Sequence, residues 1–281
     1  MKKRRIGRIF SAVLALSLFF SAFPAHAQSH ATQPVKPSLT AQSYAVIDLS
    51  DGSILHGKMP HKRLPPASTA KLMTVLIALD SLRPDVPVPV GRNAANVSPS
   101  KAGLTSGATY KAVDLVKACL VASSNDAAVA LAEAVAGGEE EFAKRMNERA
   151  KELGMTNTHF VNATGLTDER QAQYTTAYDL TRLMREAVKD RRIDEMMGLV
   201  ETSIRGSDGK AVELRAHNKM LWKMPKFVKG KTGWTAASRH TFVGTDYARR
   251  KSIAFAMLCS KKPWTDIERL ASFGAVLVRR K

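Results

Sequence analysis

The order of the secondary-structure patterns constrains the fold of this chain most strongly. Strand-like patterns lie over residues 43–58 and again over 227–259, whereas helical patterns fill most of the sequence between them. The polar stretch 246–251 is a short link between the last two strand-like segments, which predicts that they pair antiparallel. This order is typical of an α+β fold whose antiparallel sheet is built from both chain ends, flanked by helices, with a mainly helical insert.

The individual elements follow from apolar periodicity and turn signals. The helix that begins near Ser68 is apolar nearly all round, which predicts that it is buried. The segment 86–109 is rich in Pro, Gly and Ser and predicts a long surface loop. The other predicted elements are a hairpin over 43–58 with an Asp-Gly turn, helices over 68–82, 112–120, 126–136, 139–153, 175–189 and 265–278, and strands over 227–235, 241–245 and 252–259.

The N-terminus predicts export. Five basic residues within the first eight precede the apolar run Ile9–Ala22, and Ala25-His26-Ala27 is a small-x-small pattern. These features predict a signal peptide over residues 1–27 that is cleaved after Ala27; an uncleaved membrane anchor is the alternative. Residues 28–42 are predicted to be a linker and 43–281 one catalytic domain, and the mature chain is expected to act outside the cytoplasm.

The net charge limits the kinds of binding partner that can be expected. The net charge is +18, and removal of a signal peptide with five basic and no acidic residues leaves +13. Such a charge suits wall polymers or a membrane surface, although a generally basic surface without a dedicated partner is an equal alternative; export argues against nucleic acid.

Cys119 and Cys259 are predicted to be buried free thiols, with a disulfide as the alternative. No zinc signature is present, and no metal is expected.

The first chemical motif is Ser68-Thr69-Ala70-Lys71, which follows Pro65-Pro66 at the start of a predicted helix. Residues three apart share a helix face, so the Ser68 hydroxyl and the Lys71 amine are expected to lie side by side. A serine nucleophile needs a base, and burial can lower the pKa of a lysine enough for its neutral amine to accept the proton. An N-cap serine beside a solvated lysine is the alternative.

The second motif is Ser123-Ser124-Asn125, at a break between two predicted helices. A hydroxyl and an amide two residues apart could face one cleft, where Ser123 would relay a proton and Asn125 would hold a substrate backbone. A simple helix cap is the alternative.

The third motif is Lys231-Thr232-Gly233 on a predicted strand. Its lysine and hydroxyl could anchor a carboxylate, and the glycine would let a substrate approach the strand. An ordinary strand edge is the alternative. The order and context of all three motifs together favour a serine enzyme.

This motif set resembles that of the D-alanyl-D-alanine carboxypeptidase family, the low-molecular-mass penicillin-binding proteins with a β-lactamase/transpeptidase-like fold. The resemblance extends from the Tyr44 hairpin to the closing helix. Supporting segments are Ser123–Ala128, Leu153–Met155, Thr158–Phe160, Asn162–Leu166, Thr175–Leu180 and His217–Trp222.

The resemblance implies removal of the terminal D-Ala from peptidoglycan stem peptides through an acyl-enzyme on Ser68, with β-lactam antibiotics as covalent inhibitors. It implies no cofactor, and membrane contact only through an uncleaved signal. The backbone N–H groups of Ser68 and Trp234 would form the oxyanion hole. The implied catalytic residues are Ser68, Lys71 and Ser123, and the implied substrate-binding residues are Asn125, Lys231, Thr232, Gly233 and Trp234.

Two departures accompany the resemblance. Relatives commonly have Ala-Gly where this chain has Ser238-Arg239, which brings a charge near the expected cleft. The chain also ends soon after the catalytic domain, without the β-domain and amphipathic anchor of many relatives, so a soluble or signal-anchored enzyme is expected.

Three alternatives share these motifs. A D,D-endopeptidase that cuts crosslinks has the same site. A class A β-lactamase needs a Glu-x-x-Leu-Asn segment, but here Glu169 is followed by Arg170-Gln171-Ala172-Gln173, which argues against it. A non-catalytic wall-binding homologue would lack a reason to keep every reactive side chain.

Overall fold

The computed structural model describes residues 35–168, 171–223, 228–247 and 252–280. The predicted signal peptide, residues 1–27, and the first part of the predicted linker lie outside these ranges. The main sheet has the strand order β2-β1-β9-β8-β7, and every neighbouring pair is antiparallel. Its strands are β1 (Ser43–Asp48), β2 (Ile54–Lys58), β7 (Val228–Thr235), β8 (Arg239–Asp246) and β9 (Ile253–Ser260). The predicted sheet from both chain ends is therefore confirmed.

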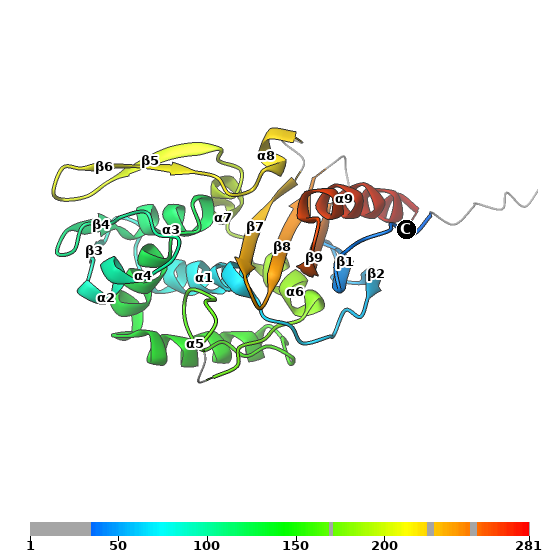
Figure 1. Ribbon diagram of the computed structural model, residues 1–281, viewed down its shortest axis with the longest axis horizontal. Coiled ribbons are helices and arrows are strands. Elements are labelled where there is room, and N and C mark those ends of the chain that lie inside the picture. The colour runs from blue at the N-terminus through cyan, green and yellow to red at the C-terminus, as the bar shows by residue number, and fades with distance from the viewer. Residues whose placement is uncertain (1–34, 169–170, 224–227, 248–251, 281) are drawn as a thin grey trace, which may run out of the picture. The chain divides into compact units, whose positions relative to one another are not determined.

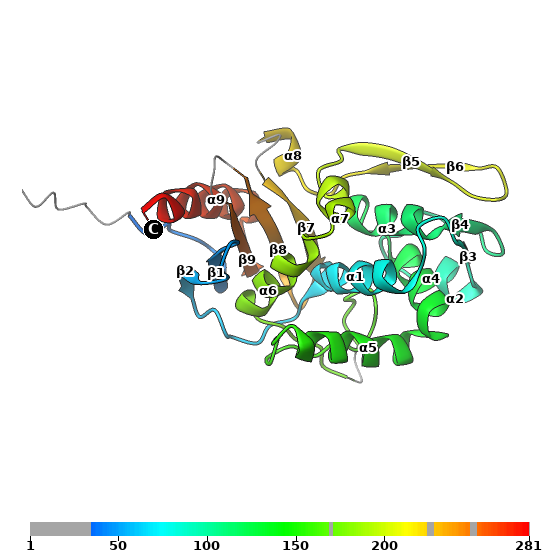
Figure 2. The ribbon, with the colours of Figure 1, turned by 180° about the vertical axis from the view of Figure 1, so that it is seen from behind.

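Helices cover both faces of this sheet (Figures 1 and 2). Helix α9 (Pro263–Arg280) packs on one face, against side chains such as Val46, Phe242 and Phe255. Helix α6 (Ala177–Ala187) contacts strands β1, β8 and β9, whose alternate residues belong to a second core. The period-two alternation of side chains along a strand supplies both apolar faces.

The helical insert surrounds helix α1 (Lys71–Ser81), which continues the short 3-10 helix η1 (Ala67–Ala70). Residues 71–79 are all buried, which confirms the prediction from the apolar pattern. Helices α3 (Ala112–Val121), α4 (Asn125–Ala136) and α5 (Glu139–Glu152) contact α1. Since α1 contacts helices on several sides, few of its positions can be polar without a specific partner.

The prediction of a long surface loop over 86–109 is wrong for its first part, whereas residues 97–108 form no helix or strand and are mostly exposed or half-buried. Strand β3 (Pro87–Pro89) pairs with β4 (Thr109–Lys111), and helix α2 (Arg92–Asn96) follows β3. Val88 and Val90 are buried, because they alternate with the prolines and their side chains reach the core, and Ala94 is the buried residue of α2. Proline is tolerated on the edge of so small a sheet.

The segment between α6 and β7 contains structure that the sequence patterns did not predict. It forms helix α7 (Arg191–Met196), a hairpin of β5 (Glu201–Arg205) and β6 (Ala211–Arg215), and helix α8 (Met220–Lys223). Only Ile204 and Leu214 of the hairpin strands are buried, which explains the weak apolar signal.

The two cysteines are free, as predicted, but only Cys119 is buried and Cys259 is half-exposed. Among the helices of the described ranges, none has the length and apolarity required to cross a bilayer.

Candidate active site

The fold brings the three sequence motifs together. Helix η1 contacts strand β7, and the turn between α3 and α4 reaches β7 through the hydrogen bond between Ser123 and Lys231. Lys71 reaches Ser68, and Lys231 reaches Ser123 across 108 residues of sequence. The site therefore lies where the helical insert meets the edge strand of the sheet.

Ser68 and Lys71 face each other across one turn. The Nζ atom of Lys71 donates to the Ser68 hydroxyl at 2.9 Å and to the Thr164 carbonyl at 2.8 Å. Lys71 is completely buried, and this burial lowers its pKa to about 8, against an opposing effect from nearby groups such as the Glu139 carboxylate. Ser68 does not cap the helix and Lys71 is not solvated, so the alternative of an N-cap serine beside a solvated lysine does not describe the structure.

Ser123 occupies a constrained turn between α3 and α4. Its φ of +58° is uncommon for a residue with a side chain and indicates that surrounding contacts hold it. Lys231 donates to the Ser123 hydroxyl at 2.8 Å and to the Thr232 carbonyl at 2.7 Å. Burial, together with the nearby Lys71, holds the pKa of Lys231 well below its ordinary value. Lys71, Lys231 and Ser123 are buried and Ser68 is half-buried, so the motifs supply two lysine–hydroxyl pairs, close enough for the charge of Lys71 to lower the pKa of Lys231.

Asn125 begins helix α4 and is 1% exposed. Its Nδ2 donates to the carbonyl of Pro99, which fixes the orientation of the carboxamide. Its Oδ1 has no hydrogen-bond partner in the described part of the chain. A buried acceptor without a partner is costly and rare, so this oxygen is available to a ligand.

Strand β7 approaches Ser68 at Gly233. A Cβ atom on Gly233 would lie 2.8 Å from the Ser68 backbone nitrogen and 2.4 Å from the Thr241 hydroxyl, so only glycine fits. The neighbouring Thr232 is half-buried, and Trp234 is 61% exposed with its ring beside His240. The backbone nitrogen of Ser68 therefore lies next to the residue that precedes Trp234.

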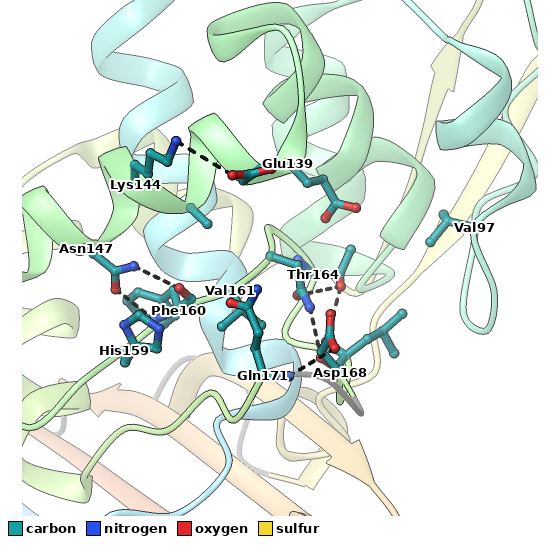
Figure 3. Close-up of a pocket in the computed structure, with 14 residues that line it drawn as sticks. Val97, Glu139, Lys144, Asn147, His159, Phe160, Val161, Thr164, Asp168 and Gln171 are labelled. Carbon is teal, nitrogen blue, oxygen red and sulfur yellow. Dashed lines mark hydrogen bonds and ion pairs between the residues drawn. The ribbon is translucent and has the colours of Figure 1, made fainter.

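The loop 159–166 lies between α5 and Lys71, and the sequence patterns assigned no role to it. Asn147 of α5 accepts from the Phe160 N–H and donates to its carbonyl, both at 2.8 Å, as Figure 3 shows. Glu139 accepts from the Ala163 N–H at 3.1 Å. The loop is thus fastened to α5 and can present the Thr164 carbonyl to Lys71.

Gly165 is a second supporting residue that was missed. Its φ is +80°, and a Cβ atom there would lie 1.9 Å from the carbonyl oxygen of Ala67, the residue before Ser68. The sequence signal was present in the family-like segment Asn162–Leu166, but the close approach to Ala67 is visible only in the structure.

A cavity of about 430 Å³ lies between α5 and this loop (Figure 3). Glu139, Thr164 and Asp168 are among its lining residues, but Ser68 and Lys71 are not. The cavity therefore does not hold the reactive groups, although it shares Thr164 with the site.

Arg239, the departure noted in the sequence, is the first residue of β8. It pairs with Thr235 across the turn that follows the third motif, has a φ of +52° and is exposed. Ser238 beside it is buried, and its hydroxyl accepts from the Thr235 N–H at 2.9 Å and donates to the Arg239 carbonyl at 2.8 Å. At the positions compared with Ala-Gly in the sequence analysis, the turn thus has a buried, hydrogen-bonded Ser238 and an exposed Arg239.

Comparison with known proteins gives consistent matches. A family model described as D-alanyl-D-alanine carboxypeptidase matches residues 28–261. The chain is 32% identical over 243 residues to D-alanyl-D-alanine carboxypeptidase DacF of Bacillus subtilis, covering 85% of this chain and 61% of that protein. It is 31% identical to DacB2 of Mycobacterium tuberculosis, covering 79% and 76%. It is 29% identical to D-alanyl-D-alanine endopeptidase of Escherichia coli, covering 92% and 83%. The chain thus spans about three fifths of the Bacillus protein's length.

Solved structures match the fold. A D-alanyl-D-alanine carboxypeptidase from Mycobacterium tuberculosis H37Rv superposes with a TM-score of 0.83 at 28% identity, covering 88% of this chain and 95% of that one. A mutant of the Streptomyces K15 DD-transpeptidase superposes with a TM-score of 0.80 at 23% identity, covering 86% and 100%. The predicted α+β, transpeptidase-like fold is confirmed.

Proposed function

The chain belongs to the D-alanyl-D-alanine carboxypeptidase family, and from this membership we propose that it removes the terminal D-Ala from peptidoglycan stem peptides. The observation that carries the proposal is the contact between Ser68 and Lys71. A hydroxyl held 2.9 Å from a buried amine, whose pKa is lowered to about 8, is a nucleophile with its own base.

The proposed reaction proceeds through an acyl-enzyme. The neutral Lys71 amine accepts the Ser68 proton, and Ser68 Oγ attacks the carbonyl carbon of the penultimate D-Ala. The backbone N–H groups of Ser68 and Trp234 stabilise the oxyanion. Ser123, held by Lys231, gives its proton to the leaving nitrogen and takes up the one that Lys71 removed from Ser68, and the C–N bond breaks to release D-Ala. Water then hydrolyses the Ser68 ester.

Substrate binding uses the remaining residues of the three motifs. The unpartnered Oδ1 of Asn125 suits a backbone N–H of the substrate. Lys231 and Thr232 are proposed to bind the terminal carboxylate, and the absence of a side chain at Gly233 is proposed to leave room for the peptide along β7. None of these steps requires a cofactor.

The cellular setting is part of the same proposal. Peptidoglycan lies outside the cytoplasm, so the enzyme is proposed to be exported, to the periplasm or its equivalent, and to act in cell-wall biogenesis and cell shape. The basic composition of the chain, +18 in all, suits contact with anionic wall polymers. β-Lactams are proposed to acylate Ser68.

The test is labelling and turnover with Ser68→Ala. Wild type is expected to bind fluorescent penicillin covalently and to release D-Ala from a pentapeptide, and Ser68→Ala to do neither. Ser272→Ala, an exposed serine on α9, is the matched control and should behave as wild type. Equal labelling of wild type and Ser68→Ala would refute the assignment of Ser68.

Endopeptidase activity on crosslinks is a second candidate. The observation in its favour is the match to the Escherichia coli endopeptidase, which covers 83% of that protein, more than the 61% of the Bacillus carboxypeptidase. Digestion of defined monomeric and crosslinked muropeptides separates the two. Cleavage of the crosslinked substrate without loss of D-Ala from pentapeptide would overturn the carboxypeptidase proposal.

A further inference from the structure

Asp126 is a buried carboxylate directly after Asn125, and the proposed chemistry does not use it. It accepts hydrogen bonds from three consecutive backbone N–H groups, those of Ala102 at 3.0 Å, Gly103 at 2.9 Å and Leu104 at 3.1 Å. Successive N–H groups directed at one carboxylate form a strong, charge-assisted contact. The start of α4 is therefore tethered to the loop 99–104.

The same loop holds Asn125 from the other side. The Asn125 backbone N–H donates to the Ser100 carbonyl at 2.8 Å, and the Asn125 Nδ2 donates to the Pro99 carbonyl. The Ser100 hydroxyl also reaches the Ser123 carbonyl at 3.5 Å. Two residues of the second motif thus contact a loop whose position depends on Asp126.

This arrangement determines which groups of Asn125 are free. An asparagine carboxamide can rotate by half a turn and exchange its oxygen and nitrogen. With Nδ2 bonded to Pro99, the oxygen must point the other way, where it is buried and unpartnered. If the loop moved away, this preference would be lost and the amide could adopt either orientation.

We propose that Asp126 is a positioning residue, which fixes the Asn125 carboxamide for the substrate amide by tethering the loop 99–104. The inference rests on the proposed function of the site, because it takes Asn125 as a substrate contact. A purely structural role would instead be the favourable placement of an acidic side chain in the first turn of α4.

The test compares two substrates. One is an acylated L-Lys-D-Ala-D-Ala peptide, and the other is its analogue with an ester oxygen in place of the N–H of the penultimate residue. The ratio of kcat/KM for the peptide to kcat/KM for the ester analogue measures how strongly the enzyme recognises that amide N–H. Asp126→Asn keeps the shape but removes the charge and points an NH2 group at N–H donors. We expect kcat/KM for the peptide to fall about tenfold or more, which is the value of one hydrogen bond, and the ratio to fall with it.

A double-mutant cycle with Asn125→Ala identifies the route. Asp126→Asn should leave the ratio unchanged in an Asn125→Ala background, because the positioned group is already gone. Asp114→Asn is the matched control, since Asp114 is the acidic residue in the first turn of α3 and forms a local ion pair with Lys117, three residues along the helix. It should leave the ratio as in wild type. Asp126→Glu keeps the charge and should restore part of the ratio; it also serves if Asp126→Asn fails to fold.

The outcomes separate the two proposals. An equal loss for both substrates at an unchanged ratio would make Asp126 merely structural and overturn the inference. If wild type releases no D-Ala at all, the proposed function fails, and Asp126 is then judged on the rate of Ser68 acylation by fluorescent penicillin. An unchanged acylation rate in folded Asp126→Asn would overturn the inference there as well.

Discussion

The Lys71 amine donates to the Ser68 hydroxyl at 2.9 Å from a position that solvent does not reach. Its second contact, at 2.8 Å, is to the Thr164 carbonyl, which accepts a hydrogen bond and cannot donate one. The loop 159–166 therefore orients the amine, and burial sets the pH at which the amine loses its proton. With a pKa lowered to about 8 by burial, about one molecule in ten has the neutral amine at pH 7.

Acylation of Ser68 should follow the titration of Lys71. Only the neutral amine can accept the Ser68 proton, so the acylation rate constant should rise about tenfold per pH unit below pH 8 and level off above it. Stopped-flow or quenched labelling with fluorescent penicillin from pH 5.5 to 9.5 measures this profile. A rate that is independent of pH between 6 and 8 would rule out Lys71 as the base.

Stability should respond to the same titration. The folded pKa of about 8 lies below the ordinary 10.5, so between these values the unfolded chain binds a proton that the folded chain does not. Stability therefore rises with pH through this window, by at most roughly 3 kcal/mol for Lys71. Urea unfolding midpoints from pH 7 to 10.5 should rise more steeply for wild type than for Lys71→Met. Parallel curves for the two proteins would contradict the expectation.

The sheet and most helices could be predicted because their patterns are local. Period-two runs gave β1, β7, β8 and β9, and the apolar helix gave α1. The hairpin of β5 and β6 could not be predicted, since each strand buries only one side chain. Segment 86–109 was misjudged because its prolines outweighed Val88 and Val90, which are buried.

The reactive side chains of the site were also predictable, but the groups that hold them were not. Ser68 and Lys71 share a local spacing that a helix brings together. Thr164 contacts Lys71 through its backbone carbonyl, a group that every residue has. Gly165 lies against the carbonyl of Ala67, 98 residues earlier in the sequence, and fits there because it has no side chain. Asp126 binds backbone N–H groups more than 20 residues away. Contacts of the backbone leave no residue-type signal in a single sequence.

Gly165→Ala should damage the site more than the fold. The new Cβ would meet the Ala67 carbonyl at 1.9 Å, so either the loop or Ser68 must shift, in addition to the strain of a φ of +80°. We expect the acylation rate to fall at least a hundredfold, since displacements near 1 Å have such effects. The measurement is penicillin labelling of folded protein.

Gly137→Ala is the matched control for this prediction. Gly137 has a φ of +79° at the end of α4, but nothing lies within 4 Å of its would-be Cβ. It should lose about 1 kcal/mol of stability and label at the wild-type rate. Equal labelling of the two variants would show that the contact with Ala67 has no bearing on Ser68.

Asp266, which belongs to none of the three motifs, should contribute strongly to stability. It is 1% exposed at the start of α9 and accepts from the Thr40 N–H at 3.0 Å, the Thr40 hydroxyl at 2.7 Å and the Ser260 hydroxyl at 2.7 Å. Asp266→Ala strands these donors and should cost about 2–4 kcal/mol in urea unfolding. It should also speed proteolysis near Thr40, because the hydrogen bonds from Thr40 to Asp266 of α9 are lost.

Glu268→Ala is the matched control. It breaks the exposed pair with Lys223 and should change the free energy of unfolding by less than about 0.5 kcal/mol. If the two variants unfold at the same urea concentration, the Thr40–Asp266 contact does not fasten the N-terminal segment.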